Sequence, residues 1–225
     1  MTPHPLAACA SFPRISAPPV DTTADDAVAA LRKEKKPAFS KGEALAEADR
    51  CLFCHDAPCM RSCPTHIDVP RFIKRIATGN LAGAADTIFA ANVLGHSCAR
   101  VCPTEVLCEG ACVLNDEHRA IDIGRLQRHA TDFALRSGQA IVTAGPRRAG
   151  AGSVGIIGAG PAGLACAAEL LRLGYAATIY EARPEGGGLN TYGVAQYKLT
   201  PEAALEEVAW LTRAGLDIRY GVAVG

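Results

Sequence analysis

Eight of the ten cysteines in this chain of 225 residues fall into two compact runs. The runs are Cys51, Cys54, Cys59 and Cys63, followed by Cys98, Cys102, Cys108 and Cys112. Each run contains a Cys-Pro pair, at Cys63-Pro64 and at Cys102-Pro103. A cubane iron–sulfur cluster needs four converging ligands, usually thiolates, and short gaps between cysteines let one loop bind three of its corners. The two runs therefore predict iron–sulfur chemistry.

The Cys-Pro pairs indicate how the ligands are shared between two clusters. In two-cluster ferredoxins the cysteine that precedes proline ligates the other cluster. The predicted ligands are Cys51, Cys54, Cys59 and Cys112 for cluster one, and Cys63, Cys102 and Cys108 for cluster two. Cluster two then lacks a ligand, and Cys98 is equally a candidate for that place and for a small buried thiol. Structural zinc is a weaker alternative, because zinc motifs favour paired CxxC knuckles and only one such knuckle is present.

A glycine-rich turn follows the cysteine runs. Its residues are Gly158, Ala159, Gly160, Pro161, Ala162 and Gly163. The first glycine permits a tight turn after a strand, the second lets a pyrophosphate approach the backbone, and the third lets helix and strand pack closely. Glu181 follows the next predicted strand, where its carboxylate can accept hydrogen bonds from a ribose diol. The pattern predicts a dinucleotide-binding turn, and FAD and NAD share this fingerprint.

Composition excludes several classes of protein. The chain carries 23 basic and 23 acidic residues, so no broad positive field is available for nucleic acid or an anionic membrane. The sequence contains no run of 18 apolar residues, so no membrane span is predicted. The first residues lack the basic and apolar pattern of a secretory signal, so a cytoplasmic location is expected. In a reducing cytoplasm, closely spaced cysteines are more often metal ligands than disulfides.

Helix and strand signals divide the chain into four segments. We expect a flexible N-terminal arm over 1–25, an α-helical iron–sulfur domain over 26–145, a linker over 146–152, and a truncated Rossmann βαβ portion over 153–225. Helices are predicted from Ser40, from Asp68, over 81–90 and 126–135, over 161–173, and from Thr200 to Gly215. Strands are predicted over 153–157, 177–180 and 217–224, with weak strand potential at 141–142. Trp210 and Cys166 are both expected in the core.

Residues 51 to 129 resemble the N-terminal iron–sulfur domain of dihydropyrimidine dehydrogenase. The bacterial flavoprotein subunit of that enzyme and the small subunit of glutamate synthase share this domain. The segments that carry the resemblance are CLFCHDAPCMRSCPTHIDVPRFI, HSCARVCPTEVLCEGACVLNDE and IDIGRLQRHA. In the dihydropyrimidine enzyme the missing ligand is a glutamine within Ile-Gly-x-Leu-Gln, which residues 123–127 match. The resemblance therefore favours Gln127 over Cys98 as the fourth ligand of cluster two.

The resemblance also implies FAD rather than NAD in the glycine turn. Gly187-Gly188-Leu189 is similar to the second glycine patch of flavoproteins that bind FAD in their first nucleotide-binding domain. Within that stretch and beyond it, the implied FAD contacts are Gly188, Leu189, Lys198 and Val224. The family has arginine at the position of Lys198, and lysine keeps the charge but loses bidentate geometry. The implied fold is an α-helical two-cluster iron–sulfur domain followed by an incomplete α/β Rossmann-type FAD-binding domain.

The resemblance implies an electron-transfer subunit of an NAD(P)-dependent dihydropyrimidine dehydrogenase. Such a subunit passes electrons from NAD(P)H through FAD and two 4Fe-4S clusters to an FMN and iron–sulfur partner that reduces uracil or thymine, so a hetero-oligomer is expected. No second GxGxxG is present, so the NAD(P)H domain is expected to be absent and the chain inactive alone, with no catalytic residue of its own. The alternatives are a relay like the glutamate synthase small subunit or a ferredoxin:NADP oxidoreductase, and a non-catalytic cluster-binding module.

Overall fold

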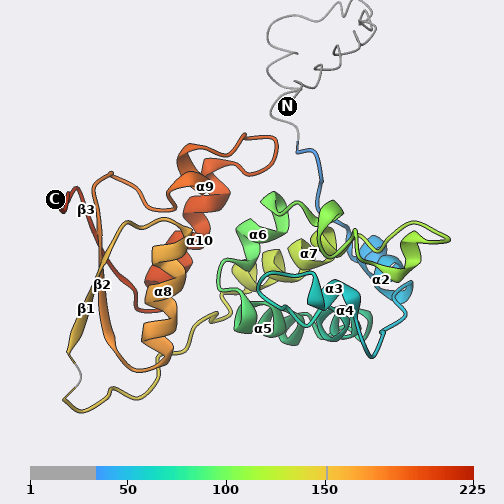
Figure 1. Ribbon diagram of the computed structural model, residues 1–225, viewed down its shortest axis with the longest axis horizontal. Coiled ribbons are helices and arrows are strands. Elements are labelled where there is room, and N and C mark those ends of the chain that lie inside the picture. The colour runs from blue at the N-terminus through green and yellow to red at the C-terminus, as the bar shows by residue number, and fades with distance from the viewer. Residues whose placement is uncertain (1–33, 151) are drawn as a thin grey trace, which may run out of the picture. The chain divides into compact units, whose positions relative to one another are not determined.

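The computed structural model describes residues 34–150 and 152–225. The first part of this range is helical and the second part is an α/β layer, as Figure 1 shows. The helical part contains α2 (Lys41–Asp49), α3 (Pro58–Arg61), α4 (Val69–Ala77), α5 (Leu81–Ala91), α6 (Gly95–Val101), α7 (Ile123–Ser137) and two 3₁₀ turns, Thr104–Val106 and Val113–Asn115. The expected arm over 1–25 lies outside the described residues. None of the helices in the described ranges is long and apolar enough to cross a membrane.

Local capping signals determine where two of the helices begin. Ser40 Oγ accepts a hydrogen bond from the N–H of Glu43, and the Glu43 carboxylate accepts one from the N–H of Ser40, so the predicted capping box precedes α2. Asp68 likewise caps α4 by accepting from the N–H of Arg71. Both predicted helix starts are confirmed. The helix α7 begins at Ile123, three residues before the predicted start.

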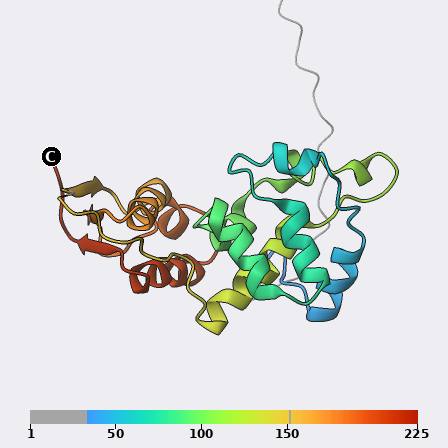
Figure 2. The same cartoon turned by 90° about the horizontal axis from the view of Figure 1, so that it is seen from below.

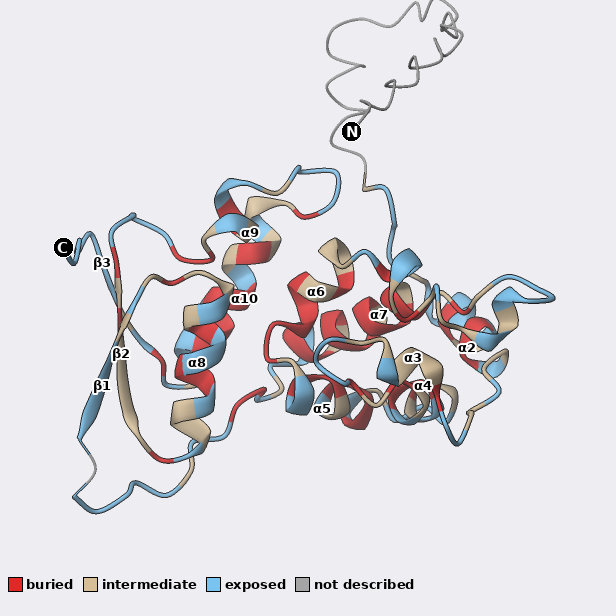
Figure 3. Cartoon of the chain, viewed as in Figure 1, coloured by how far each residue is buried: buried red, intermediate tan, exposed pale blue. Residues whose placement is uncertain are grey.

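The helical part has an apolar core of its own. Most of its largest fully buried side chains come from α4, α5 and α7, and Figure 3 shows buried positions along α6 and α7. These side chains include Phe72, Ile73, Ile76, Ile88 and Leu126. Burying each one contributes about 1.5–3 kcal/mol relative to exposure. This core underlies the loops that carry the cysteines, because partly buried Cys51, Cys59, Cys63 and Cys112 pack against it.

The α/β part is a three-stranded parallel sheet in the order β1-β2-β3. The strands are β1 (Ser153–Ile157), β2 (Ala176–Glu181) and β3 (Asp217–Tyr220), with α8 (Pro161–Arg172), α9 (Leu189–Tyr192) and α10 (Pro201–Arg213) between them. Val154 pairs with Ala177, and Ile179 pairs with Ile218. The predicted β-α-β opening is present, although β3 ends at Tyr220, before the expected Val224.

A second apolar core joins the two parts. Phe89 on α5 meets Trp210 on α10 in an edge-to-face contact with ring centroids 4.9 Å apart. Trp210 is 3% exposed, as predicted, and its indole N–H donates to the carbonyl of Gln139 at 2.9 Å. The weak strand predicted at Ile141 and Val142 is wrong, because both residues lie in this core in irregular backbone. Figure 2 gives a second view of the helical part (blue to yellow) and the α/β part (orange to red).

The first residues of the predicted linker over 146–152 lie against the end of α8. The N–H of Gly145 donates to the carbonyl of Leu171 at 3.0 Å, and the N–H of Arg148 donates to that of Gly174 at 3.2 Å. Gly174 has a φ of +80°, and a Cβ at this position would lie 2.1 Å from the carbonyl oxygen of Pro146. The segment is thus bound to the α/β part, and the domain boundaries within it stay a prediction.

Candidate iron–sulfur and dinucleotide sites

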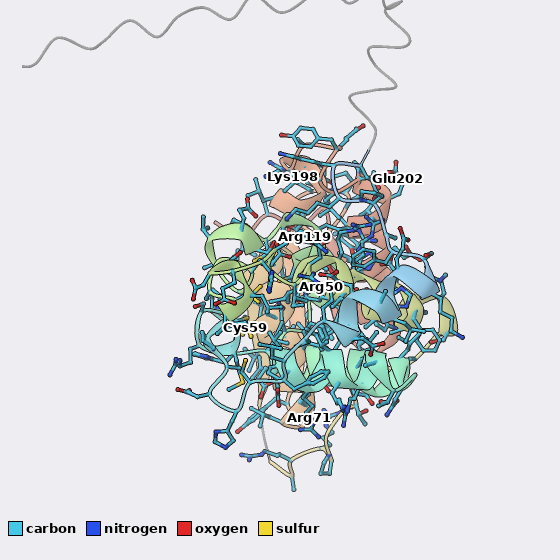
Figure 4. The ribbon with its side chains drawn as sticks, turned by 90° about the vertical axis from the view of Figure 1, so that its right-hand side faces the viewer. Arg50, Cys59, Arg71, Arg119, Lys198 and Glu202 are labelled. Atoms are coloured by element: carbon cyan, nitrogen blue, oxygen red, sulfur yellow. The ribbon has the colours of Figure 1, made fainter. Side chains whose placement is uncertain are left out.

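The four cysteines predicted for cluster one line a single hollow in the helical part. They are Cys51, Cys54, Cys59 and Cys112. The other lining residues are apolar: Leu52, Pro58, Val69, Pro70, Ile73, Val113, Leu114, Ile121 and Ile123. Burial, with a further contribution from the neighbouring Cys51, raises the pKa of Cys59 to about 11. Figure 4 labels Cys59 in a view of this side of the molecule.

The three cysteines predicted for cluster two also lie near one another. Cys102 is influenced electrostatically by both Cys108 and Cys63, although Cys63 lies in the other run. Burial, reinforced by the Glu109 carboxylate, raises the pKa of Cys108 to about 12. The structure thus places Cys63 near the second run and Cys112 near the first, and the assignment of these residues to two clusters stays a prediction.

Cys98 lies beside this second group. Its thiol hydrogen bonds to Cys102, which raises the pKa of Cys98 and lowers that of Cys102. Gln127, on α7, is close to the same thiol and is 6% exposed. Both candidates for the fourth ligand of cluster two therefore lie at the same place, and geometry leaves the choice between them a prediction.

Partly buried thiols in apolar surroundings fit a cluster as their partner. The thiolate form of each is unfavourable while it is desolvated, and bound metal supplies the positive charge that deprotonates a coordinating thiol. A 4Fe-4S cluster takes four cysteine thiolates in this way. Within residues 34–150 and 152–225, no three His, Cys, Asp or Glu side chains converge closely enough to hold a single metal ion.

A buried ionic network supports α6, the helix that carries Cys98. The Asp132 carboxylate lies 3.1 Å from His96 Nδ1 and accepts a hydrogen bond from Arg100 Nη2 at 2.8 Å. Burial alone would raise the pKa of Asp132, but the hydrogen bonds with His96 and Arg100 lower it well below its ordinary value. The network therefore holds the start and the end of α6 to α7.

Replacing Asp132 with asparagine is expected to destabilise the chain by about 3 kcal/mol at pH 7, because Arg100 then stays buried without its carboxylate. A carboxyl with a lowered folded-state pKa contributes stability above its ordinary pKa of about 3.9, and this contribution is lost as the pH falls through the folded value. The difference between the two chains in urea unfolding should therefore persist at pH 5 and shrink below pH 4. Asp116→Asn, at an exposed position, is the matched control. An equal loss in both variants would contradict the assignment.

The glycine turn has the geometry that its sequence predicts. Gly158 follows β1 with a φ of +92°, a conformation that L side chains rarely adopt. Gly160 is the N-cap of α8 and Pro161 is its first residue. A Cβ on Gly163 would lie 2.0 Å from the carbonyl oxygen of Gly158, so only glycine fits there. Phosphate groups bind at helix starts of this kind because the N–H groups there are free and the helix dipole is positive.

The second glycine segment packs directly on the first. The N–H of Gly187 donates to the carbonyl of Ala159 at 2.7 Å. Gly188 has a φ of +54°, and a Cβ on it would lie 2.7 Å from Gly160 Cα. Leu189 begins α9 and is 69% exposed. The structure therefore brings the predicted Gly188 and Leu189 to the turn that precedes α8.

Glu181 is also at this turn. One carboxylate oxygen accepts from the N–H of Ala159 at 2.7 Å, and the other accepts from the N–H of Arg183 at 2.9 Å. The side chain is 9% exposed. Each oxygen keeps a further lone pair, so the carboxylate both orders the turn and can accept from a ribose hydroxyl.

The other two predicted FAD contacts, Lys198 and Val224, are not among the residues that pack at the glycine turn. Lys198, labelled in Figure 4, lines a hollow together with Cys102, Arg100 and Lys36. The sequence had given no reason to connect Lys36 with a cluster; its ammonium donates to Thr104 Oγ1 at 3.1 Å. Val224 follows β3 and is 52% exposed. The structure thus places Lys198 beside a predicted ligand of cluster two.

Comparison with known proteins gives the ancestry of both parts. Residues 28–139 match the family described as dihydropyrimidine dehydrogenase domain II, 4Fe-4S cluster. Residues 156–200 match the family of NAD(P)-binding Rossmann-like domains. The subunit PreT of NAD-dependent dihydropyrimidine dehydrogenase from Salmonella typhimurium is 43% identical over 192 residues, 85% of this chain and 46% of that protein. The Escherichia coli PreT subunit is 45% identical over 193 residues, again 85% and 46%.

The small chain of glutamate synthase [NADPH] from Escherichia coli is similar as well, at 41% identity over 187 residues, which are 83% of this chain and 39% of that protein. The chain is a homologue of these oxidoreductase subunits. It combines a match to a 4Fe-4S domain with a match to a Rossmann-like nucleotide-binding domain, and the expected resemblance is confirmed. The chain spans about half the length of the curated relatives it matches.

Proposed function

We propose that this chain is the cluster-binding and FAD-binding part of an electron-transfer subunit of the dihydropyrimidine dehydrogenase type. The observation that carries this proposal is the grouping of cysteines across the two runs, with Gln127 beside the second group. Identity of 43–45% to PreT subunits supports the same assignment. When bound, FAD accepts two electrons from a reduced nicotinamide and releases them singly to clusters that carry one each.

The chain's own residues have distinct roles in this proposal. Cluster one is bound in the apolar hollow of the helical part by Cys51, Cys54, Cys59 and Cys112. Cluster two is bound by Cys63, Cys102, Cys108 and Gln127. The FAD contacts are Gly158, Ala159, Gly160, Pro161, Ala162, Gly163, Glu181, Gly188, Leu189, Lys198 and Val224. A neutral amide ligand makes cluster two less negative than four thiolates would, and so easier to reduce.

The electron acceptor is proposed to be an FMN and iron–sulfur subunit that reduces uracil or thymine, bound in a hetero-oligomer. Similarity to the small chain of glutamate synthase makes that enzyme's large chain the alternative acceptor. The experiment is to supply the reduced chain with each partner separately. Electron transfer to the pyrimidine reductase alone would support the first function, and transfer to the glutamate synthase chain alone would favour the second.

Isolated as these 225 residues, the chain is expected to retain FAD weakly or not at all. The α/β part after residue 152 has about 73 residues, a size at which a single core supplies only about 3–5 kcal/mol. The measurement is the flavin-to-protein ratio after gel filtration of chain reconstituted with FAD. Stoichiometric flavin in the protein peak would contradict the expectation. The control for binding at the turn is Gly188→Ala. Its added Cβ would lie 2.7 Å from Gly160 Cα and would force the two glycine segments apart.

A further inference from the structure

One peptide group connects a carboxylate on α10 with the side-chain amide of Gln127. It is the peptide between Gly95 and His96, at the start of α6. Its carbonyl oxygen, on Gly95, accepts a hydrogen bond from Gln127 Nε2 at 2.8 Å. Its N–H, on His96, donates to Glu207 Oε1 at 2.9 Å. The three groups form a continuous hydrogen-bonded chain from α10 through α6 to α7.

Glu207 is buried against the start of α6. It is 1% exposed, and its carboxylate also accepts from the N–H and the hydroxyl of Ser97. In the described part of the chain no lysine or arginine forms an ion pair with it, and burial raises its pKa against the opposing effects of His96 and Ser97. A buried carboxylate without a basic partner costs free energy that an apolar side chain would not. Packing alone therefore does not account for a glutamate at this position.

The chain of hydrogen bonds acts on the amide of Gln127 in two ways. With its Nε2 bound to Gly95, the amide keeps one orientation, and its oxygen takes part in no hydrogen bond within the described residues. Hydrogen bonds in series also polarise one another in a low-dielectric interior. An acceptor at the N–H of His96 makes the Gly95 carbonyl a stronger acceptor, which increases the electron density on the oxygen of Gln127.

We propose that Glu207 is a positioning residue for electron transfer: through the Gly95–His96 peptide it holds the Gln127 amide so that the Gln127 oxygen serves as a ligand of cluster two. The inference rests on the proposed role of Gln127 as that ligand. Because Glu207 belongs to the α/β part, packing of α10 against α6 and binding of cluster two are coupled. Outer-sphere partners of metal ligands have effects of this kind on affinity and on reduction potential.

The test compares the Glu207→Gln variant with the unsubstituted parent chain, both reconstituted anaerobically. Glutamine has the same size but presents an N–H group where Ser97 needs an acceptor. We expect a higher midpoint potential for cluster two and about tenfold faster loss of its iron to a chelator, with the EPR signal of cluster one unchanged. Glu206→Gln, at the exposed neighbouring position on α10, should match the parent chain in both measurements. If Glu207→Gln fails to fold, Glu207→Asp, whose shorter side chain withdraws the carboxylate from the His96 N–H, should give a smaller shift in the same direction.

A second variant separates the hydrogen-bonded chain from a simple charge effect. Gln127→Cys replaces the amide by a thiolate that has no N–H to donate to Gly95. In that background Glu207→Gln should leave the potential of cluster two unchanged, whereas a shift of the same size with and without Gln127 would overturn the inference. An unaltered potential of cluster two in Glu207→Gln would also overturn the inference. If that variant and the parent chain both held two clusters, the proposed function would still stand. Zinc, or one cluster, in the parent chain would overturn both.

Discussion

Replacing Cys63 with alanine is expected to remove cluster two and to leave cluster one in place. Cys63 is the last cysteine of the first run, so assignment by sequence proximity would predict loss of cluster one instead. The structure turns Cys63 toward Cys102 and Cys108, at the other group. Iron content should fall from about eight to about four per chain, since each cubane cluster holds four irons. The remaining EPR signal should be that of cluster one.

The reciprocal variant is Cys112→Ala, which should remove cluster one although Cys112 ends the second run. Cys166→Ala is the matched control, because this thiol is exposed on α8, outside both runs. Unchanged iron and spectra are expected for it. Loss of cluster one in Cys63→Ala, or of cluster two in Cys112→Ala, would show that each run binds its own cluster.

Replacing Gly163 with alanine is expected to destabilise the α/β part by about 3 kcal/mol or more. The added Cβ would lie 2.0 Å from the carbonyl oxygen of Gly158, which is backbone and cannot move aside as a flexible side chain would. Relief requires that α8 shift away from β1, and this shift opens the turn that is proposed to bind pyrophosphate. The unfolding midpoint in urea should fall, and FAD affinity should fall with it.

The matched control is Gly155→Ala, on β1. A Cβ there would meet only the ring of Tyr180, at 3.5 Å, which is an ordinary van der Waals contact. Its free energy of unfolding should stay within about 0.5 kcal/mol of that of the parent chain. Equal midpoints for Gly163→Ala and the parent chain would mean that α8 and β1 are not packed as closely as the structure has them.

Sequence reasoning succeeded where the signal is local. The capping box at Ser40 and the cap at Asp68 are satisfied by residues three positions away, and both helices begin where predicted. It failed for α6, for which no side-chain cap is formed at Leu94. The N–H groups at the start of α6 are satisfied by Glu207, 110 to 111 positions along the chain. No window of neighbouring residues contains that information.

The candidate sites show the same division. The Cys-Pro rule and the glycine spacing describe short segments, and the structure places the residues of each group near one another, while their roles as ligands stay predictions. Lys36 and Glu207 were missed because their relevance comes from tertiary contacts with the loop and helix that carry Cys102. The core position predicted for Cys166 is wrong: the neighbouring Ala167 and Ala168 take the buried face of α8, and the thiol is exposed.

The position of Trp210 makes its fluorescence an intrinsic probe of the contact between the helical and α/β parts. It is the single tryptophan of the sequence, and it lies between Phe89 and the carbonyl of Gln139, where the helical and α/β parts meet. Its emission should shift to longer wavelength when water reaches the indole. Tryptophan fluorescence therefore follows separation of the two parts, whereas the visible absorption of the clusters follows the helical part. Recorded together during unfolding, the two signals would show whether the electron-carrying centres are released before or after the parts come apart.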